Sequence, residues 1–140
     1  IQSLIERYNL ANRAEYCGWL TNEEKPSVLK KCMLNVLPSY NEGLPMTILE
    51  TMSYGLPNIS TNIAAIPELV KDGENGILIT PGDVESLKNA LLDLLLNEDK
   101  RKQMSDKAYE SIQGNFTVEK HLDNVLAIYK NLISGANGKN

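Results

Sequence analysis

Histidine and cysteine, the residues that most often bind transition metals, are scarce in this chain, which has one histidine, His121, and two cysteines, Cys17 and Cys32. No metal cluster of familiar ligand spacing can be assembled from so few residues. Each cysteine stands beside an apolar run, which predicts two buried small hydrophobic side chains. His121 falls in a helical pattern and is expected to be an ordinary helix residue. We therefore expect no metal site.

Long hydrophobic runs are absent as well, since the apolar stretches are far shorter than the ~18 consecutive residues that cross a bilayer. Residues 1–7 lack the basic start and apolar core of a secretory signal. The 14 basic and 18 acidic residues are scattered along the chain and give a net charge of −4. This balance argues against a nucleic-acid partner. We expect a water-soluble domain.

Short apolar strands alternate with amphipathic helices along most of the chain. This alternation predicts an α/β fold, a Rossmann-like parallel sheet with helices on both faces and a helical C-terminal end. One domain over residues 1–133 is expected, followed by a flexible tail over residues 134–140 that is rich in Gly and Asn. The expected strands are 14–19, 33–37, 57–61 and 77–79. The expected helices are 3–10, a helix from Thr21 or Asn22 through Cys32, 45–54, 66–70, 83–95, 99–113 and 117–133.

Local signals mark where several of these helices begin, end and face the core. Pro45 opens one helix and Gly55 closes it, while Asp83 caps the helix that follows the Pro81-Gly82 turn. Two apolar stripes are expected to face inward. The first comprises Val84, Leu87, Leu91, Leu94 and Leu95, and the second comprises Val118, Leu122, Val125, Leu126 and Tyr129.

The loop over residues 38–44 is where a ligand is expected, because open parallel sheets bind ligands beyond the carboxyl ends of their strands. The helix after this loop has Leu44 as its expected N-cap, which carries no side-chain oxygen. The backbone N–H groups of Met46 and Thr47 are thereby left available. A phosphate at this helix tip gains both donors and the helix dipole, together worth about 0.5 to 2 kcal/mol.

Two carboxylates, Glu42 and Glu50, flank this helix tip. Glu50 lies one turn beyond Thr47 and could accept both hydroxyls of a ribose, whereas Glu42 could accept hydroxyls of a sugar beyond the phosphates. Spacing alone leaves plainer interpretations open. Glu50 could simply solvate an exposed helix face, and Ser39, Asn41 or water could satisfy the free amides.

The same residues resemble the C-terminal, donor-binding domain of retaining GT-B glycosyltransferases of family GT4, the glycosyl transferases group 1. Weaker similarity extends over most of the chain, from Tyr16 to Tyr129. Where the family often has paired glycines, this chain has Ala64-Ala65, and Thr51 and Asn58 also depart from the usual pattern. The matching motifs are Val36-Leu37-Pro38-Ser39, Glu42-Gly43-Leu44-Pro45, Leu49-Glu50, Gly55-Leu56-Pro57, Pro67-Glu68, Asp72-Gly73, Asn75-Gly76 and Pro81-Gly82-Asp83.

The resemblance implies transfer of a sugar from a nucleotide-sugar, with a UDP-sugar favoured, to a glycan or lipid-linked acceptor. No cofactor and no metal is implied, because amides and basic side chains stabilise the departing diphosphate. The implied catalytic residue is Glu42, which supports an oxocarbenium-like sugar. The implied substrate-binding residues are Gly43, Leu44, Met46, Thr47 and Glu50.

Family members carry an acceptor-binding domain and further βα units before the point where this chain begins. Those units supply an arginine and a lysine that neutralise the diphosphate, whereas Arg7, Arg13, Lys30 and Lys31 read as surface charges. We therefore expect this chain alone to be inactive. Soluble composition and the implied use of a nucleotide-sugar place the enzyme in the cytoplasm, and the full-length enzyme could associate peripherally with the inner face of the membrane. Two alternatives stay open: a non-catalytic sugar-nucleotide-binding or assembly module, and, less favoured, a GT-B sugar-nucleotide epimerase.

Overall fold

The computed structural model describes residues 1–136, with side chains described through residue 134. The chain divides into two compact units, Ile1–Lys31 and Cys32–Asn140. Each unit is described by itself below. The candidate site lies entirely within the second unit.

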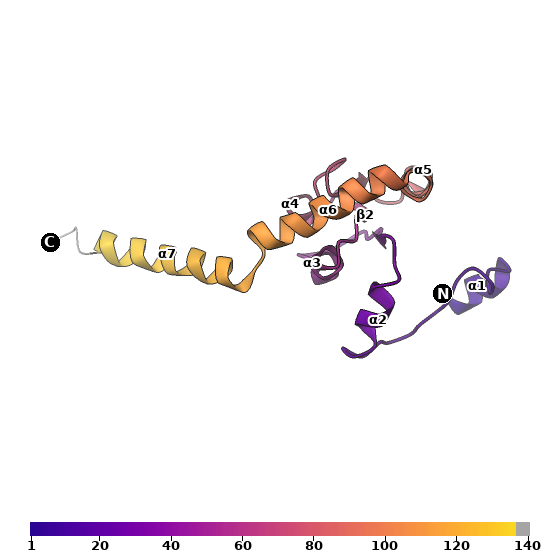
Figure 1. Ribbon diagram of the computed structural model, residues 1–140, viewed down its shortest axis with the longest axis horizontal. Helices are drawn as coiled ribbons and strands as arrows, with labels where there is room; N and C mark the ends of the chain where they lie inside the picture. The colour runs from indigo at the N-terminus through magenta and orange to yellow at the C-terminus, as the bar shows by residue number, and fades with distance from the viewer. Residues whose placement is uncertain (137–140) are drawn as a thin grey trace. The chain divides into compact units, whose positions relative to one another are not determined.

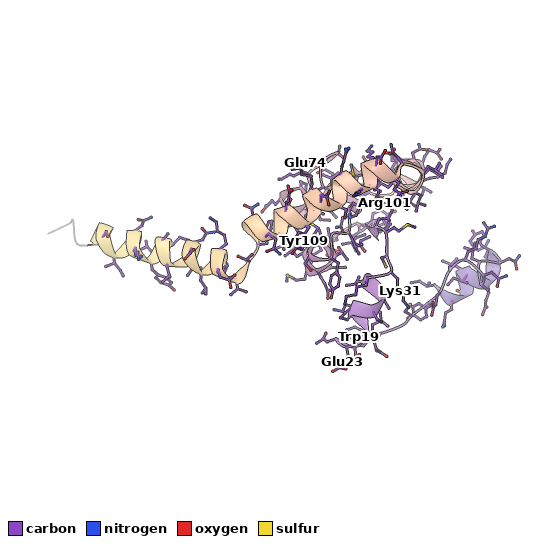
Figure 2. The ribbon with its side chains drawn as sticks, viewed as in Figure 1. Trp19, Glu23, Lys31, Glu74, Arg101 and Tyr109 are labelled. Carbon is purple, nitrogen blue, oxygen red and sulfur yellow. The ribbon has the colours of Figure 1, made fainter. Side chains whose placement is uncertain are left out.

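The first unit holds two short helices, α1 (Gln2–Arg7) and α2 (Lys25–Leu29). The strand expected over residues 14–19 is wrong, because these residues form an irregular segment and Trp19 is 95% exposed (Figure 2). A strand exists through hydrogen bonds to a neighbouring strand, and residues 1–31 contain none. The expectation of two buried cysteines is also wrong, since Cys17 in this segment and Cys32 are both exposed.

The second unit is built on a three-stranded, fully parallel sheet of order β1-β2-β3, whose central strand β2 is labelled in Figure 1. Since parallel neighbours need crossover connections, a helix follows β1 and another follows β2 before the chain re-enters the sheet. The strands are β1 (Asn35–Leu37), β2 (Asn58–Thr61) and β3 (Gly76–Ile79). The helices are α3 (Met46–Ser53), α4 (Ile66–Leu69), α5 (Val84–Leu96), α6 (Glu98–Asn115) and α7 (Val118–Ala136).

Two hydrophobic clusters form the core and confirm the α/β prediction. One cluster joins α3, α4 and the second half of α6, and the other joins β2, β3, α5 and the first half of α6. All four residues of the central strand β2 are buried. The fully buried apolar side chains of the first cluster include Ile48, Met52, Ile66 and Val70, and those of the second include Ile59 and Leu94.

Most of the local signals in this unit are confirmed. Asp83 caps α5, accepting hydrogen bonds from the backbone N–H of Ser86 at 2.9 Å and from its hydroxyl at 2.6 Å. The bond from the Ser86 side chain, reinforced by that from its amide, lowers the pKa of Asp83. Gly55 follows the end of α3 with φ of 69°, the left-handed conformation that glycine adopts without strain.

The apolar stripes are only partly correct. In α5, Leu94 is buried and Leu87 and Leu91 are half-buried, but Val84 is 74% exposed and Leu95 is 46% exposed. The stripe of α7 is wrong, because Val125 is half-buried while the other four side chains are exposed. Periodicity identifies an apolar face, but it does not say whether another element covers that face. The four exposed residues are Val118, Leu122, Leu126 and Tyr129.

Several boundaries also differ from expectation; for example, α1 ends at Arg7 rather than at residue 10. The helix through Cys32 ends at Leu29, β1 begins at Asn35 rather than at residue 33, and α7 extends to Ala136, into the predicted tail. Residues 137–140 of that tail lie outside the described residues. No helix in the described part of the chain is both long enough and apolar enough to cross a membrane.

Ala64 carries a backbone conformation that explains why glycine is common at this place in the resembled family. Its φ is 47°, in the left-handed region that costs an alanine about 1 to 2 kcal/mol. We therefore expect Ala64→Gly to raise the free energy of unfolding by about 0.5 to 1 kcal/mol, net of the added entropy of the unfolded chain. Urea-induced unfolding measures this change.

The matched control for that prediction is Ala127→Gly, at an exposed position inside α7. This substitution is expected to lower the free energy of unfolding by about 1 kcal/mol, because glycine disfavours helix interiors. A loss of stability in both variants would contradict the strain assigned to Ala64.

Candidate functional site

The candidate site occupies the edge of the sheet where the three parallel strands end. Beyond that edge, β1 continues into the loop over residues 38–45, which leads directly into α3. The backbone N–H of Ala65, after β2, donates to the carbonyl of Gly43 at 3.4 Å, and the N–H of Asn62 donates to the carbonyl of Ile79 at 2.9 Å. The loops that follow β1 and β2 are therefore in direct contact.

Glu42 is held in place by its own loop. The Ser39 hydroxyl donates a hydrogen bond of 2.7 Å to Oε1 of Glu42. The Thr61 hydroxyl, at the end of β2, donates to the carbonyl of Ser39, also at 2.7 Å. Thr61 is fully buried and Glu42 is half-buried, so the carboxylate is tied to the central strand through a single intermediate residue.

The N-terminus of α3 is open. Its N-cap is Pro45, which has no side chain that accepts hydrogen bonds. The first N–H with a partner is that of Ile48, which donates to the carbonyl of Pro45 at 3.0 Å. Neither Met46 nor Thr47 has a hydrogen-bond acceptor for its amide among the described residues. The helix tip therefore presents two backbone donors and the positive end of the helix dipole.

One sequence expectation at this tip needs correction. Leu44 is not the N-cap, because α3 begins at Met46 and Pro45 takes the capping position. Proline fixes its own φ near −65°, and here Pro45 has φ of −73°. Its ψ of 108° is extended, so Pro45 itself is not helical and precedes the first helical residue. Leu44 lies one position earlier and is 48% exposed. The free amides of Met46 and Thr47 are unaffected by this shift.

The six site residues predicted from the sequence all lie on the segment that leaves β1. Glu42, Gly43 and Leu44 belong to the loop, and the other three belong to α3. Met46 and Thr47 form its exposed first turn, and Glu50 is half-buried in the second turn. Ser39 does not cap the amides, which was one of the plainer alternatives, since its hydroxyl is bonded to Glu42.

The helix that carries Glu50 is anchored to the sheet by buried polar side chains. The single proton of the Thr51 hydroxyl is shared between acceptors that include the carbonyl of Thr47 at 2.9 Å and Oδ1 of Asn58 at 3.0 Å. Asn35 donates to the same Asn58 oxygen at 2.7 Å. Thr51 and Asn58 are the two polar departures from the family pattern, and the structure pairs them across the core. Each polar group thus has a partner despite burial.

The segment that carries the site contributes no basic side chain, because no lysine or arginine occurs between Lys31 and Lys71. The four basic residues that the sequence assigned to the surface are all exposed, namely Arg7, Arg13, Lys30 and Lys31. Arg7 instead stacks on the ring of Tyr8, with 5.6 Å between the guanidinium carbon and the ring centroid. Within residues 32–70, only backbone amides are therefore available to bind an anion at the tip of α3.

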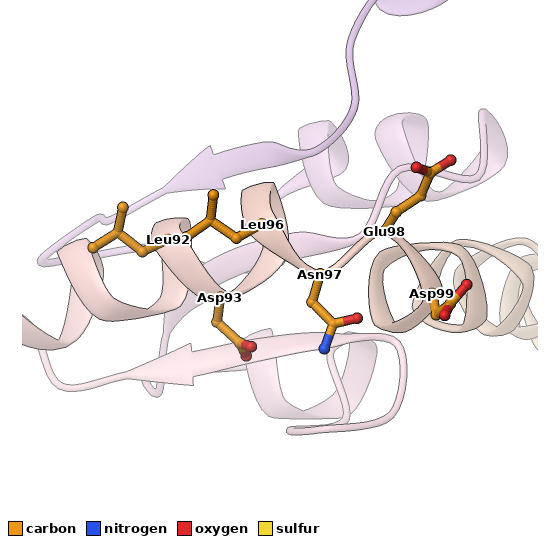
Figure 3. Close-up of a pocket in the computed structure, with 6 residues that line it drawn as sticks. All are labelled: Leu92, Asp93, Leu96, Asn97, Glu98 and Asp99. Carbon is orange, nitrogen blue, oxygen red and sulfur yellow. The ribbon is translucent and has the colours of Figure 1, made fainter.

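A larger surface hollow, of about 620 Å³, lies at the junction of α5 and α6 (Figure 3). It is far from the candidate site, since α5 starts near the ends of the strands and its 13 residues extend about 20 Å. Figure 3 shows Leu92 and Leu96 on one side of the helix and Asp93 and Asn97 on the other. With Glu98 and Asp99 also on its wall, this hollow does not suit an anionic ligand.

A smaller hollow, of about 190 Å³, does lie at the same edge as the site. It is bounded by Tyr40, from the loop after β1, and by Gly82 and Leu87, from the segment after β3. A Cβ on Gly82 would stand only 3.1 Å from the phenol oxygen of Tyr40. The absence of a side chain on Gly82 therefore allows the two loops to approach closely. The edge beside Glu42 is therefore shaped by both loops.

Sequence reasoning missed Ser39 and Thr61 as functional candidates. The signal for Ser39 was present, because a serine three residues before a glutamate has the spacing of a capping box, in which the two residues hydrogen-bond to each other. Thr21 and Glu24 show the same spacing, and there the amide and hydroxyl of Thr21 both donate to the Glu24 carboxylate. Thr61 had no local signal, since its partner Ser39 lies 22 residues away.

Comparisons with known proteins agree with this architecture. A galactosyltransferase of Escherichia coli, UDP-Gal:alpha-D-GlcNAc-diphosphoundecaprenol alpha-1,3-galactosyltransferase, is 36% identical over 129 residues, which cover 89% of this chain and 32% of that protein. The structure of sucrose-phosphate synthase from Thermosynechococcus elongatus matches with a TM-score of 0.85 at 25% identity, over 96% of this chain and 34% of the other. HepE from Anabaena in complex with UDP-glucose matches with a TM-score of 0.82 at 24% identity, over 93% and 35%.

These matches bear on the family of the chain and on the share of each matching protein that it covers. The chain spans about a third of the length of each of these three proteins. Its parallel sheet with helices on both faces is the architecture of the GT-B glycosyltransferases. The family model for glycosyl transferases group 1 matches residues 1–111, which include every candidate site residue. The chain therefore belongs to the glycosyl transferases group 1 family.

Proposed function

We propose that this chain forms the donor-binding half of a retaining glycosyltransferase of family GT4 that uses a nucleotide-sugar. The observation that carries the proposal is the open tip of α3, with two free amides between a tethered Glu42 and Glu50 one turn further on. Backbone donors at a helix N-terminus bind phosphate well. Carboxylates on either side suit the hydroxyls of two sugars, one on each side of a diphosphate.

In this arrangement the diphosphate lies against the amides of Met46 and Thr47, with Gly43 and Leu44 alongside. Glu50 accepts hydrogen bonds from the ribose hydroxyls, and Glu42 faces the transferred sugar. During transfer the bond between the sugar C1 and the diphosphate oxygen breaks, and the nucleotide leaves with the electron pair. A new C1–O bond forms to the acceptor hydroxyl on the same face, and the hydroxyl proton is released. Glu42 stabilises the positive charge that develops on the sugar ring.

The favoured donor is a UDP-sugar, which rests on two similarities. HepE, which shares this fold, has been crystallised with UDP-glucose, and the name of the E. coli relative specifies a UDP-galactose donor. The acceptor, a glycan or a lipid-linked sugar, would be bound by parts of the protein outside this chain. We also propose that the amides take the place of a metal ion in stabilising the departing diphosphate, and that the enzyme works in the cytoplasm, where nucleotide-sugars are used.

A panel of donors tests this function on the full-length protein. UDP-glucose, UDP-galactose and UDP-N-acetylglucosamine are each incubated with the protein, and release of UDP is measured, with water as acceptor when no other is supplied. We expect UDP release from one donor and, by NMR, a first-formed product with the anomeric configuration of the donor. Binding of UDP without release would favour a non-catalytic module, and interconversion of the donor sugars would favour an epimerase.

Glu50 is expected to contribute to nucleotide affinity. Glu50→Ala should weaken binding of UDP by about 1 to 3 kcal/mol, the scale of a lost hydrogen bond to a charged group. Isothermal titration calorimetry with UDP measures the change, and thermal unfolding checks that the variant is folded. Glu42→Ala serves as the control, because UDP lacks the donor sugar that Glu42 is proposed to face. Unchanged affinity of the Glu50 variant would remove this residue from the site.

A further inference from the structure

We propose that Ser39 is a positioning residue that holds the Glu42 carboxylate in its working orientation, and that Thr61 in turn holds Ser39. This inference rests on the proposed function, because Glu42 needs a defined orientation only if it faces a reacting sugar. The hydrogen bonds from Thr61 to Ser39 and from Ser39 to Glu42, each of 2.7 Å, carry it. They connect a fully buried strand residue to a loop carboxylate.

The hydrogen bond from Ser39 uses one oxygen of the Glu42 carboxylate and leaves the other oxygen available to a ligand. Ser39 donates to Oε1 of Glu42, so Oε2 can face a ligand. A glutamate on a loop otherwise samples several rotamers, since its side chain has three rotatable bonds. A misplacement of about 1 Å at a reacting centre can lower the rate on the order of 100-fold. Fixing the carboxylate before the donor arrives therefore favours turnover more than donor binding.

Thr61 reaches Ser39 because β2 ends where the loop after β1 begins. β1 and β2 are paired in parallel up to Leu37 and Ser60, so Thr61 is the next strand residue along and projects toward the loop. Its hydroxyl donates to the Ser39 carbonyl, not to a group within its own strand. The residue before it, Ser60, makes a similar bond of 2.8 Å to the carbonyl of Leu37, which lies within β1. Thr61 thus supports the loop, whereas Ser60 supports the strand.

Ser39→Ala in the full-length enzyme tests the first link. With whichever of the three UDP-sugars the wild type cleaves, we expect kcat for UDP release to fall about 10- to 100-fold and KM to change by less than about threefold. Ser39→Thr keeps the hydroxyl and should recover most of the rate. In an enzyme that already carries Glu42→Ala, the Ser39→Ala change should have no further effect, because the residue that it positions is gone.

Thr61→Val and Ser60→Ala form a matched pair for the second link. Each removes one buried hydroxyl that donates to a backbone carbonyl, so both should lower the unfolding temperature. Only Thr61→Val should also lower kcat, about 3- to 30-fold, since only Thr61 supports the loop that carries Glu42. Equal losses of kcat in the two variants would show that general loosening of the sheet, not positioning, affects turnover.

The outcomes separate this inference from the proposed function. If the wild type releases no UDP from any of the three donors, the proposed function fails and the positioning role fails with it. If the wild type is active but Ser39→Ala retains its kcat, the inference is overturned while the function stands. A further loss from Ser39→Ala in the Glu42→Ala background would also overturn it, because Ser39 would then act independently of Glu42.

Discussion

Glu42→Ala is expected to lower kcat of the full-length enzyme about 100- to 1000-fold, while KM for the donor changes by less than about threefold. Loss of one group that stabilises transition-state charge typically has an effect of this size. The effect falls on kcat because the sugar ring carries its positive charge only in the transition state. Steady-state kinetics of UDP release from the active UDP-sugar measures both constants.

Glu68→Ala is the control for this substitution. Glu68 belongs to the same group of motifs, but it is exposed on α4 and does not belong to the predicted site. Its replacement should leave kcat and KM within about twofold of the wild type, as is usual for surface positions. A Glu42 variant with normal turnover would refute the role assigned to this carboxylate, whatever the control shows.

Gly76→Ala is expected to destabilise the fold by about 3 kcal/mol, at the upper end of the cost of overpacking. Gly76 pairs with Asn58 across β2 and β3 and is buried. A Cβ at this position would overlap the carbonyl oxygen of Asn58 and would lie 2.8 Å from Cγ1 of Val70. Neither atom can move without displacing the central strand or the core. Urea unfolding monitored by circular dichroism gives the change.

Gly114→Ala is the control for Gly76→Ala, because the space around its new methyl group is open. Gly114 lies in α6, and nothing stands within 4 Å of the position that its Cβ would take. Alanine favours helices over glycine, so this substitution should raise stability by about 0.5 to 1 kcal/mol. Similar changes in the two variants would mean that the close contact at Gly76 does not determine its effect.

Much of the site could be predicted because it is continuous in sequence. Glu42, the free amides of Met46 and Thr47, and Glu50 follow one another along a single loop and helix, so the position of the strand before them was sufficient to place them. The exact cap was missed by one residue, since Pro45 and not Leu44 precedes the first helical residue. That error concerns only which residue is the N-cap, and the free N–H groups are still those of Met46 and Thr47.

The errors in the fold share a different cause. Residues 14–19 have the composition of a strand, and the final helix has the periodicity of a packed one, yet the first forms no strand and the second leaves most of its apolar face exposed. Pairing and burial both require a second element, and that element is not encoded in the segment itself. Composition can therefore predict the capacity of a segment to pair or pack, but not its partner.

By itself, the sequence determined the features that depend on neighbours along the chain: the alternation of strands and helices, the Asp83 cap, the glycine after α3, and the order of acid, amides and acid at the candidate site. Only the tertiary structure decided which distant groups meet. The bond of Thr61 to Ser39 and that of Asn58 to Thr51 both link the central strand to the segment that carries the site. Hydrogen bonds act over about 3 Å in space regardless of separation in sequence, so such pairs appear only once the sheet has formed.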